Sequence, residues 1–178
     1  MSRNAGFAEL AKQFEAMNKK LQKQDFDEFC RNVAKELAAR LLAKVIKRTP
    51  VGKYPKGSGK MGGTLRRGWT AKTESEAASG GNSDAKSYAN ALPITKSGNA
   101  YEIEIINPVR YASYVEYGHR RDGGIPFQLP SGQWRRTSEG WTKGKFMLTK
   151  SEIEVQKWAD GNLEKKIAQY LGEVLNGK

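Results

Sequence analysis

Two stripes of hydrophobic residues at helical spacing occupy the N-terminal part of the chain. The first covers residues 7–21 and has a polar back, which predicts a helical extension within residues 1–24. The second follows Asp25 and stops before Pro50, because proline disfavours helix at the residue that precedes it. We therefore expect an N-terminal extension followed by one domain over residues 25–178, since a single core commonly serves about 100 to 200 residues.

The centre of the chain has the pattern of a small sheet. Polar and apolar residues alternate over residues 101–106, and a turn-forming tetrapeptide, Lys96–Asn99, separates them from residues 91–95. This arrangement predicts a β-hairpin, and residues 64–72 predict a further strand. A last helical stripe follows Thr149, which opens a Thr–x–x–Glu capping box. The predicted fold class is α+β, with a small antiparallel sheet flanked by N-terminal and C-terminal helices.

Long stretches rich in small and polar residues separate these elements. We expect mobile loops near residues 51–63, 73–88 and 118–146, of which the first and last carry several Lys and Arg residues. A structureless stretch as long as the last one is normally functional or mobile in a compact domain. A short helix is predicted over residues 109–117, ended by Gly118 in a left-handed cap.

Positive charge is concentrated rather than spread. The chain has 31 Lys and Arg against 19 Asp and Glu, a formal net charge of +12, and nine of its cations lie between Lys44 and Lys72 with no acid among them. Such a segment indicates an anionic neighbour, either a nucleic acid or an acidic protein surface, although a solubilising face is the plain alternative. The candidate contact residues are Lys53, Lys56, Lys60, Arg66, Arg67, Arg120, Arg121, Arg135 and Arg136.

Residues that carry chemistry are scarce. His119 is the only histidine and Cys30 the only cysteine, so the chain lacks the ligand set of a zinc site and cannot form an internal disulfide. The Gly57–Lys60 segment lacks the first glycine and the Ser/Thr of a phosphate-binding loop and follows a helix rather than a strand. We expect no metal, no cofactor and no enzymatic activity. No apolar run approaches the ~18 residues of a membrane span, so we expect no membrane partner.

Four segments, in order, resemble the signature of one family. Thr49–Gly52 (TPVG) and Gly63–Trp69 (GTLRRGW) are similar to its "TPV" and "TG-x-LR-x-S/G-W" blocks, with Gly62 in the place of the threonine. Tyr111–Arg120 (YASYVEYGHR) is similar to its "YA-x-YVE-x-G" block, and Gly144–Leu148 (GKFML) to the block that enters its last helix. The family is the HK97 gp10-like group of phage neck and tail-completion proteins, which also occurs in defective prophages.

The resemblance implies a structural subunit of a homo-oligomeric ring, expected to be a hexamer, that joins the head connector to the tail, with connector and tail-terminator or tube proteins as neighbours. It would belong to the neck or tail of the virion and be assembled in the host bacterial cytoplasm. The expected subunit-interface residues are Tyr111, Tyr114, Glu116 and Tyr117. Burial of the tyrosines in the chain's own core is the alternative. Glu116 would pair with a neighbour's Arg66 or Arg67, or with a group of its own chain, or with none.

A non-catalytic DNA-binding protein is the alternative function. Its 44–72 segment would contact phosphates, and Trp69, Trp134 and Trp141 would stack on single-stranded bases, unless these rings serve as core or loop anchors. No recognition helix or known binding motif accompanies the basic segment. The two functions are compatible, because a ring subunit that lines a channel would make non-specific contact with DNA.

Overall fold

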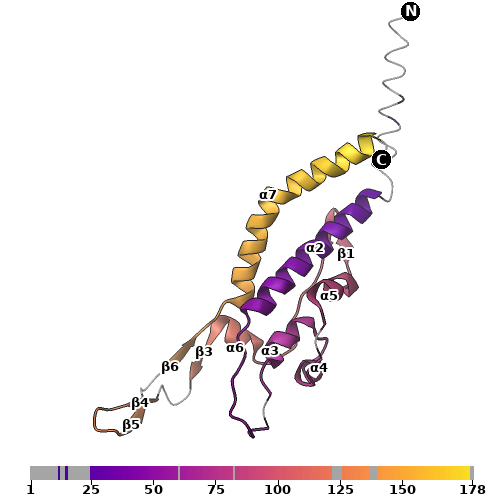
Figure 1. Ribbon diagram of the computed structural model, residues 1–178. Helices are drawn as coiled ribbons and strands as arrows, with labels where there is room; N and C mark the ends of the chain where they lie inside the picture. Colours follow the sequence, from indigo (N-terminus) through magenta and orange to yellow (C-terminus); the bar gives the residue numbers. More distant parts are fainter. Residues whose placement is uncertain are drawn as a thin grey trace, which may run out of the picture.

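Two long helices form the body of the protein. The computed structural model describes residues 12, 15, 25–59, 61–81, 83–121, 126–136 and 140–176. Helix α2 (Asp25–Arg48) and helix α7 (Met147–Asn176) lie side by side, and α7 bends partway along its length (Figure 1). The extension expected within residues 1–24 lies outside the described residues, apart from two helical positions, Lys12 and Glu15.

The two helices are antiparallel, and paired side chains hold their register. An aromatic stack, an ion pair, a cation–π contact and a second ion pair occur in order along the pair: Phe29–Tyr170 (4.5 Å between ring centroids), Glu36–Lys166 (2.8 Å), Arg40–Trp158 (3.7 Å to the ring centroid) and Lys44–Glu154 (2.8 Å). Most of the stabilisation comes from the apolar stripe beneath them, because exposed ion pairs contribute only ~0–1 kcal/mol.

The body is completed by four short helical elements that pack on the other side of α2. They are α3 (Thr64–Arg67), the 3₁₀ helix η1 (Gly68–Thr70), α4 (Glu74–Ala78) and α5 (Ala85–Ala91). The strand predicted over residues 64–72 is therefore wrong, as is the loop predicted over residues 73–88. Leu65 and Trp69 are both buried and lie four residues apart, which is the spacing of one helix face.

Local capping explains why the second of these segments is helical. The Thr73 side chain accepts a hydrogen bond from the backbone N–H of Glu76 at the start of α4. Asp84 accepts from the backbone N–H groups of Lys86 and Ser87 at the start of α5. Each cap satisfies donors that a short helix leaves free, so a segment with few apolar residues still folds.

The predicted hairpin is present but short. Strands β1 (Thr95–Ser97) and β2 (Ala100–Glu102) pair in antiparallel register, and residues 91–94 are not part of the ladder because α5 extends to Ala91. The Lys96 ammonium and the Tyr101 hydroxyl each donate to Asp27 of α2 at 2.5 Å. These hydrogen bonds, with one from an arginine on α2, hold the pKa of Asp27 well below its usual range and attach the hairpin to the helix.

A second pair of ribbons projects from the end of the body. After helix α6 (Ala112–Tyr117), strand β3 (Gly118–Arg121) pairs with β6 (Gly140–Lys143), and beyond them β4 (Pro126–Gln128) pairs with β5 (Trp134–Arg136). Figure 1 shows them as an arm directed away from α2 and α7. The mobile loop predicted over residues 118–146 is therefore wrong for its described part, which is mainly antiparallel ribbon.

The α+β fold class is confirmed, with N- and C-terminal helices around small antiparallel sheets. Within the described residues, the strands form three separate two-stranded sheets rather than one sheet. Among the described helices, none has both the length and the apolar content that crossing a membrane requires.

A polar junction lies inside the core where α2 ends. The Thr49 hydroxyl is fully buried, donates to the Val45 carbonyl at 2.7 Å and accepts from the Trp69 indole N–H at 2.7 Å. The Thr49 carbonyl accepts two hydrogen bonds from the Arg66 guanidinium, at 3.1 and 2.7 Å. The junction joins the end of α2 to the α3–η1 segment and leaves neither the indole nor the hydroxyl unsatisfied.

Replacement of Thr49 tests the junction. Thr49→Val keeps the shape of the side chain but leaves the buried indole N–H of Trp69 without its acceptor. We expect the free energy of unfolding to fall by about 1–3 kcal/mol, measured by urea denaturation. The matched control, Thr95→Val on the exposed strand β1, should change it by less than about 0.5 kcal/mol. A T49V protein as stable as the wild type would contradict this role.

Candidate assembly interface

Two of the candidate contact cations are engaged inside the chain. Arg66 binds the Thr49 carbonyl as described, and Arg67 donates from Nε to the Ala77 carbonyl at 2.8 Å and from Nη1 to the Gly62 carbonyl at 3.1 Å. Both side chains are half-buried. Their donors hold the short helices together, so we no longer assign either arginine to contact with phosphates or with a neighbouring subunit.

One of the three candidate stacking tryptophans lies in the core and two lie outside it. Trp69 is 4% exposed, which excludes it from base stacking in this fold. Trp134 and Trp141 are 69% and 59% exposed and lie on strands β5 and β6 of the arm. The DNA-binding alternative therefore loses one of its three aromatic side chains and two arginines of its basic segment, Arg66 and Arg67.

Glycines of the same segment sit where a side chain would collide. Gly63 has φ +92° at the start of α3, a left-handed conformation that favours glycine. A Cβ at Gly62 would lie 2.2 Å from the Gly52 carbonyl oxygen, so the two ends of the loop between them are in close contact. A Cβ at Gly68 would lie 2.2 Å from Oδ1 of Asn107. The Asn107 side chain is held there by a hydrogen bond from its Nδ2 to the Leu65 carbonyl at 2.9 Å.

Glu116 does not face outward as an interface residue would. It is 5% exposed, and its carboxylate accepts from the backbone N–H groups of Leu148 (2.9 Å) and Thr149 (3.0 Å) and from the Thr149 hydroxyl (2.8 Å). These are free donors at the first turn of α7. Of the three alternatives stated for Glu116, the structure therefore shows the one within its own chain, as a helix cap supplied from α6.

Capping also decides where α7 begins. The helix starts at Met147, and Thr149, expected as its N-cap, lies inside the first turn and donates its hydroxyl to Glu116. Burial raises the pKa of Glu116, but hydrogen bonds from the first turn of α7 outweigh burial, and the pKa lies below its ordinary value of 4.5.

Backbone hydrogen bonds also hold the base of the arm together, next to the first turn of α7. The backbone N–H of Lys145 donates to the Val115 carbonyl at 2.8 Å, and that of Phe146 donates to the Glu116 carbonyl at 3.0 Å. Gly118 ends α6 as predicted, but its φ of +86° and ψ of 172° differ from the left-handed helical conformation of the predicted cap. A Cβ there would lie 2.3 Å from the Thr142 carbonyl oxygen. The strand that leaves α6 and the strand that returns to α7 are thus held in close contact.

Exposed aromatic rings gather on the arm and its root. In the described part of the chain, α6 and the residue before it expose three tyrosines, and the ribbons expose a phenylalanine and two tryptophans: Tyr111 (42%), Tyr114 (58%), Tyr117 (61%), Phe127 (41%), Trp134 (69%) and Trp141 (59%). We call residues 111–143 the aromatic arm. Burial of the three tyrosines in the chain's own core is excluded by these values, and their place in a subunit interface remains a prediction.

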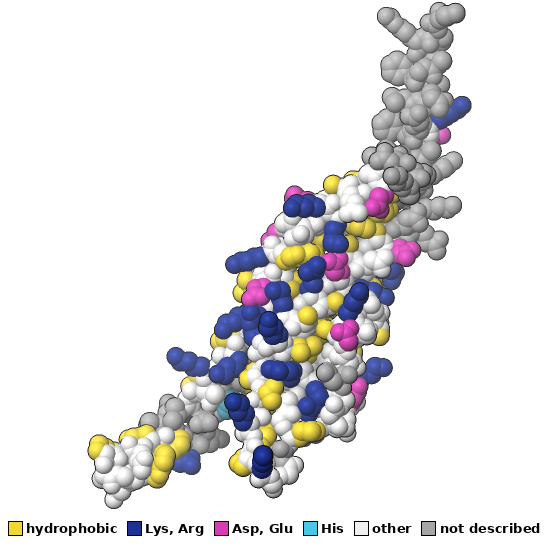
Figure 2. All heavy atoms as spheres, in the orientation of Figure 1, with side chains coloured by type: hydrophobic (Ala, Val, Ile, Leu, Met, Phe, Trp, Pro, Cys, Tyr) yellow, Lys and Arg dark blue, Asp and Glu magenta, His cyan; other side chains and the backbone are white. Residues whose placement is uncertain are grey.

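The remaining candidate cations lie on the two projections of the molecule. Lys53 and Lys56 are exposed on the loop of residues 51–59, which we call the basic loop, and Lys60 lies outside the described residues. On the arm, the side chains of Arg120 on β3 and of Arg135 and Arg136 on β5 are exposed. The side chain of Arg121 lies outside the described part of the structure. Figure 2 shows other Lys and Arg side chains distributed over the body.

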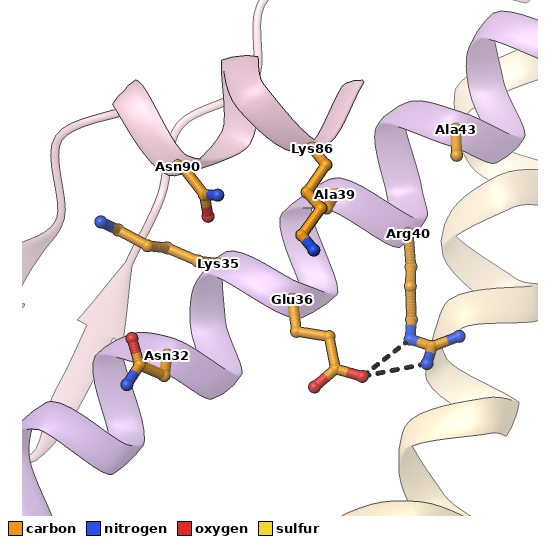
Figure 3. A pocket seen from close by; sticks show the side chains of 8 residues that line it. All are labelled: Asn32, Lys35, Glu36, Ala39, Arg40, Ala43, Lys86 and Asn90. Atoms are coloured by element: carbon orange, nitrogen blue, oxygen red, sulfur yellow. Dashed lines mark hydrogen bonds and ion pairs between the residues drawn. The ribbon is translucent and has the colours of Figure 1, made fainter. Parts of the chain in front are cut away.

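A groove of ≈ 500 Å³ lies along α2 beside α5 (Figure 3). Lys86 extends from α5, and Lys35, Glu36 and Arg40 extend from α2. Arg40 is committed to Glu36, donating from Nε at 3.2 Å and from Nη2 at 2.9 Å. The groove adds to the positive surface. Nowhere in the described residues do three or more His, Cys, Asp or Glu side chains converge as around a metal ion.

The chain belongs to a phage protein family. The matching family model is described as "Bacteriophage HK97-gp10, putative tail-component" and covers residues 8–118. A search of curated proteins and a search of solved structures each gave no match. The resemblance stated from the sequence blocks is thereby confirmed as to family, and a tail component is part of the virion. Most of the aromatic arm, and all of α7, lie beyond the matched residues.

The sequence predictions missed part of this surface. They selected the tyrosines and the arm tryptophans but not Phe127, because its segment was interpreted as a structureless loop. The alternation that would have indicated ribbons is weak, since strands β4 and β5 have only three residues each and are exposed at every position.

Replacement of Glu116 tests the helix cap. Glu116→Gln removes the charge and one acceptor oxygen, and we expect the free energy of unfolding at pH 7 to fall by about 1–3 kcal/mol. Because the pKa of Glu116 is lower in the folded than in the unfolded chain, its contribution is complete above the ordinary value and is lost as the pH falls through the folded value. The gap between variant and wild type should therefore close in acid.

Urea denaturation across pH 3–7 measures this gap, with the exposed Glu104→Gln as the matched control. The control should differ from the wild type by less than about 0.5 kcal/mol at every pH. A gap for E116Q that does not change with pH would contradict the charge-assisted cap.

Proposed function

We propose that this protein is a structural, non-catalytic subunit of a ring in the phage neck or at the point of tail completion, joining the head connector to the tail. One observation carries the proposal beyond the family assignment. The aromatic arm and the basic loop project from the same end of the helical body, where α2 ends and α7 begins (Figure 1). Exposed aromatic side chains at such positions are typical of surfaces that another protein covers.

The two projections differ in chemistry, which supports two kinds of contact. The arm presents large aromatic side chains, which suit a permanent interface between neighbouring subunits. We take the oligomeric ring that these subunits form to be a hexamer. The basic loop presents Lys53 and Lys56 beside the exposed Tyr54, suited to the acidic surface of an adjacent connector, tail-terminator or tube protein. The ring would be assembled in the cytoplasm of the host bacterium before it becomes part of the virion.

Protein assembly is favoured over DNA binding by the fate of the basic segment. Arg66 and Arg67 donate hydrogen bonds to backbone carbonyls within the chain, and Trp69 is buried. The lysines left on the loop could still make non-specific contact with DNA in a channel. A channel must let DNA slide, however, so a dense positive lining is not an obvious requirement of this role.

Charge reversal on the basic loop tests the contact with the adjacent ring. We expect Lys53→Glu/Lys56→Glu to leave ring formation intact and to weaken attachment to the tail by at least about tenfold, because four units of charge change at one contact. The matched control, Lys157→Glu/Lys165→Glu, makes the same change at exposed positions of α7 and should leave attachment unchanged.

Native mass spectrometry of the full chain gives the stoichiometry, and electron microscopy of particles from the encoding phage gives the position of the ring. A protein absent from purified particles, whose deletion leaves head–tail joining intact, would overturn the proposal. Tight binding to duplex DNA would favour the DNA-binding alternative instead, if the K53E/K56E variant also reduced the slope of log affinity against log salt concentration.

A further inference from the structure

A second, apolar groove lies along α2, between the segment that follows β2 and helix α7. Its volume is ≈ 290 Å³. Its floor comes from α2 and its two walls from the chain after β1 and from α7: Ala34, Leu37, Ala38 and Leu41 form the floor, and Tyr101, Ile103, Ile105, Glu152, Val155 and Gln156 the walls. Apolar side chains therefore line most of the groove, and a single carboxylate, that of Glu152, stands in its α7 wall.

One wall of the groove is an open strand edge. Residues 101–106 alternate between half-buried and exposed positions as a strand does, but the ladder of β1 and β2 ends at Glu102. Within the described part of the chain, the backbone N–H and C=O groups of residues 103–106 have no backbone hydrogen-bond partner. An extended segment with free backbone groups is a template for one more strand.

The tip of the aromatic arm has the complementary chemistry. Strands β4 and β5 are exposed at every residue, and each has an outer edge that pairs with no described strand. Trp134 is 69% exposed, and the next residue, Arg135, places a guanidinium on the opposite face of the same strand. Transfer of an exposed indole from water into an apolar groove is favourable, since an aromatic side chain of this kind buries about 150–250 Å² of surface.

We infer that this groove receives the β4–β5 tip of a second copy of the chain. Trp134 of the incoming arm lies on the apolar floor at Leu37 and Leu41, an edge of the ribbon adds a strand to residues 103–106, and Arg135 faces Glu152. This inference rests on the proposed function, because it supplies the contact that closes the ring.

The choice of a second copy follows from two observations. Figure 1 shows the arm directed away from the body, so its tip does not reach the groove of its own chain. Every copy has both a protruding tip and a groove, at different places on its surface. A contact between two different surfaces of identical chains is head-to-tail, which is the geometry that generates closed rings.

Photocrosslinking tests the contact in the full chain. Trp134→benzoylphenylalanine is prepared in unlabelled protein, mixed with ¹⁵N-labelled wild type, assembled and irradiated. We expect crosslinked peptides that join position 134 of an unlabelled chain to residues 34–41, 101–106 or 152–156 of a labelled chain. The same probe at Ile167, which is 44% exposed on α7 and does not line the groove, is the control and should not crosslink to residues 126–136.

A charge exchange gives an independent readout. Arg135→Glu and Glu152→Arg should each raise the protein concentration needed for half-assembly by about tenfold, and the double variant should return it to within about threefold of the wild type. The exposed Glu164→Arg, further along α7, is the control and should leave assembly unchanged. Because these side chains are exposed or form the groove surface, circular dichroism and thermal unfolding of the free chain should not change.

The outcomes separate this inference from the proposed function. Rings that form normally but crosslink elsewhere, or to a different tail protein, overturn the inference and leave the ring subunit in place. Rings in which R135E and E152R are additive rather than compensating also overturn it. A chain that forms no ring at any concentration, alone or in particles, overturns both.

Discussion

The arrangement of this protein depends on the carboxylate of Glu116 at the first turn of α7. Helix N-termini leave backbone N–H groups free, and here a side chain of α6 binds them, rather than a residue adjacent in sequence. The cap joins α6, at the start of the aromatic arm, to α7, which follows the arm. With the Lys145 and Phe146 backbone bonds, it holds both ends of the arm at one point, which sets the direction in which the arm projects.

The family signature is mainly a packing signature. Thr49, Arg66 and Trp69 form the junction at the end of α2, and Gly68 makes room for Asn107. These residues explain how the end of α2 packs on the α3–η1 segment, and they are turned inward and leave little for a partner to contact. The surfaces that differ in chemistry are the basic loop, which lies between two signature blocks, and the aromatic arm, most of which lies beyond the matched residues.

Sequence reasoning succeeded where a pattern is long or locally determined. The stripe before Pro50 predicted α2, the stripe after Thr149 predicted α7 to within two residues, and Gly118 was correctly placed at the end of α6. It failed at residues 64–72, where Leu65 and Trp69 fit either period. It failed again at residues 73–88 and 118–146, because caps and three-residue strands leave weak hydrophobic patterns.

By itself, then, the sequence determined the fold class, the two long helices, the family and the excess of positive charge, because periodicity, composition and signature blocks are properties of the chain. Only the tertiary structure decided which cations are available. In it, Arg66 and Arg67 bind backbone carbonyls of their own chain, and Trp69 and Glu116 are buried. Trp134 and the lysines of the basic loop are exposed. Availability depends on contacts between residues far apart in sequence, and those contacts have no local pattern.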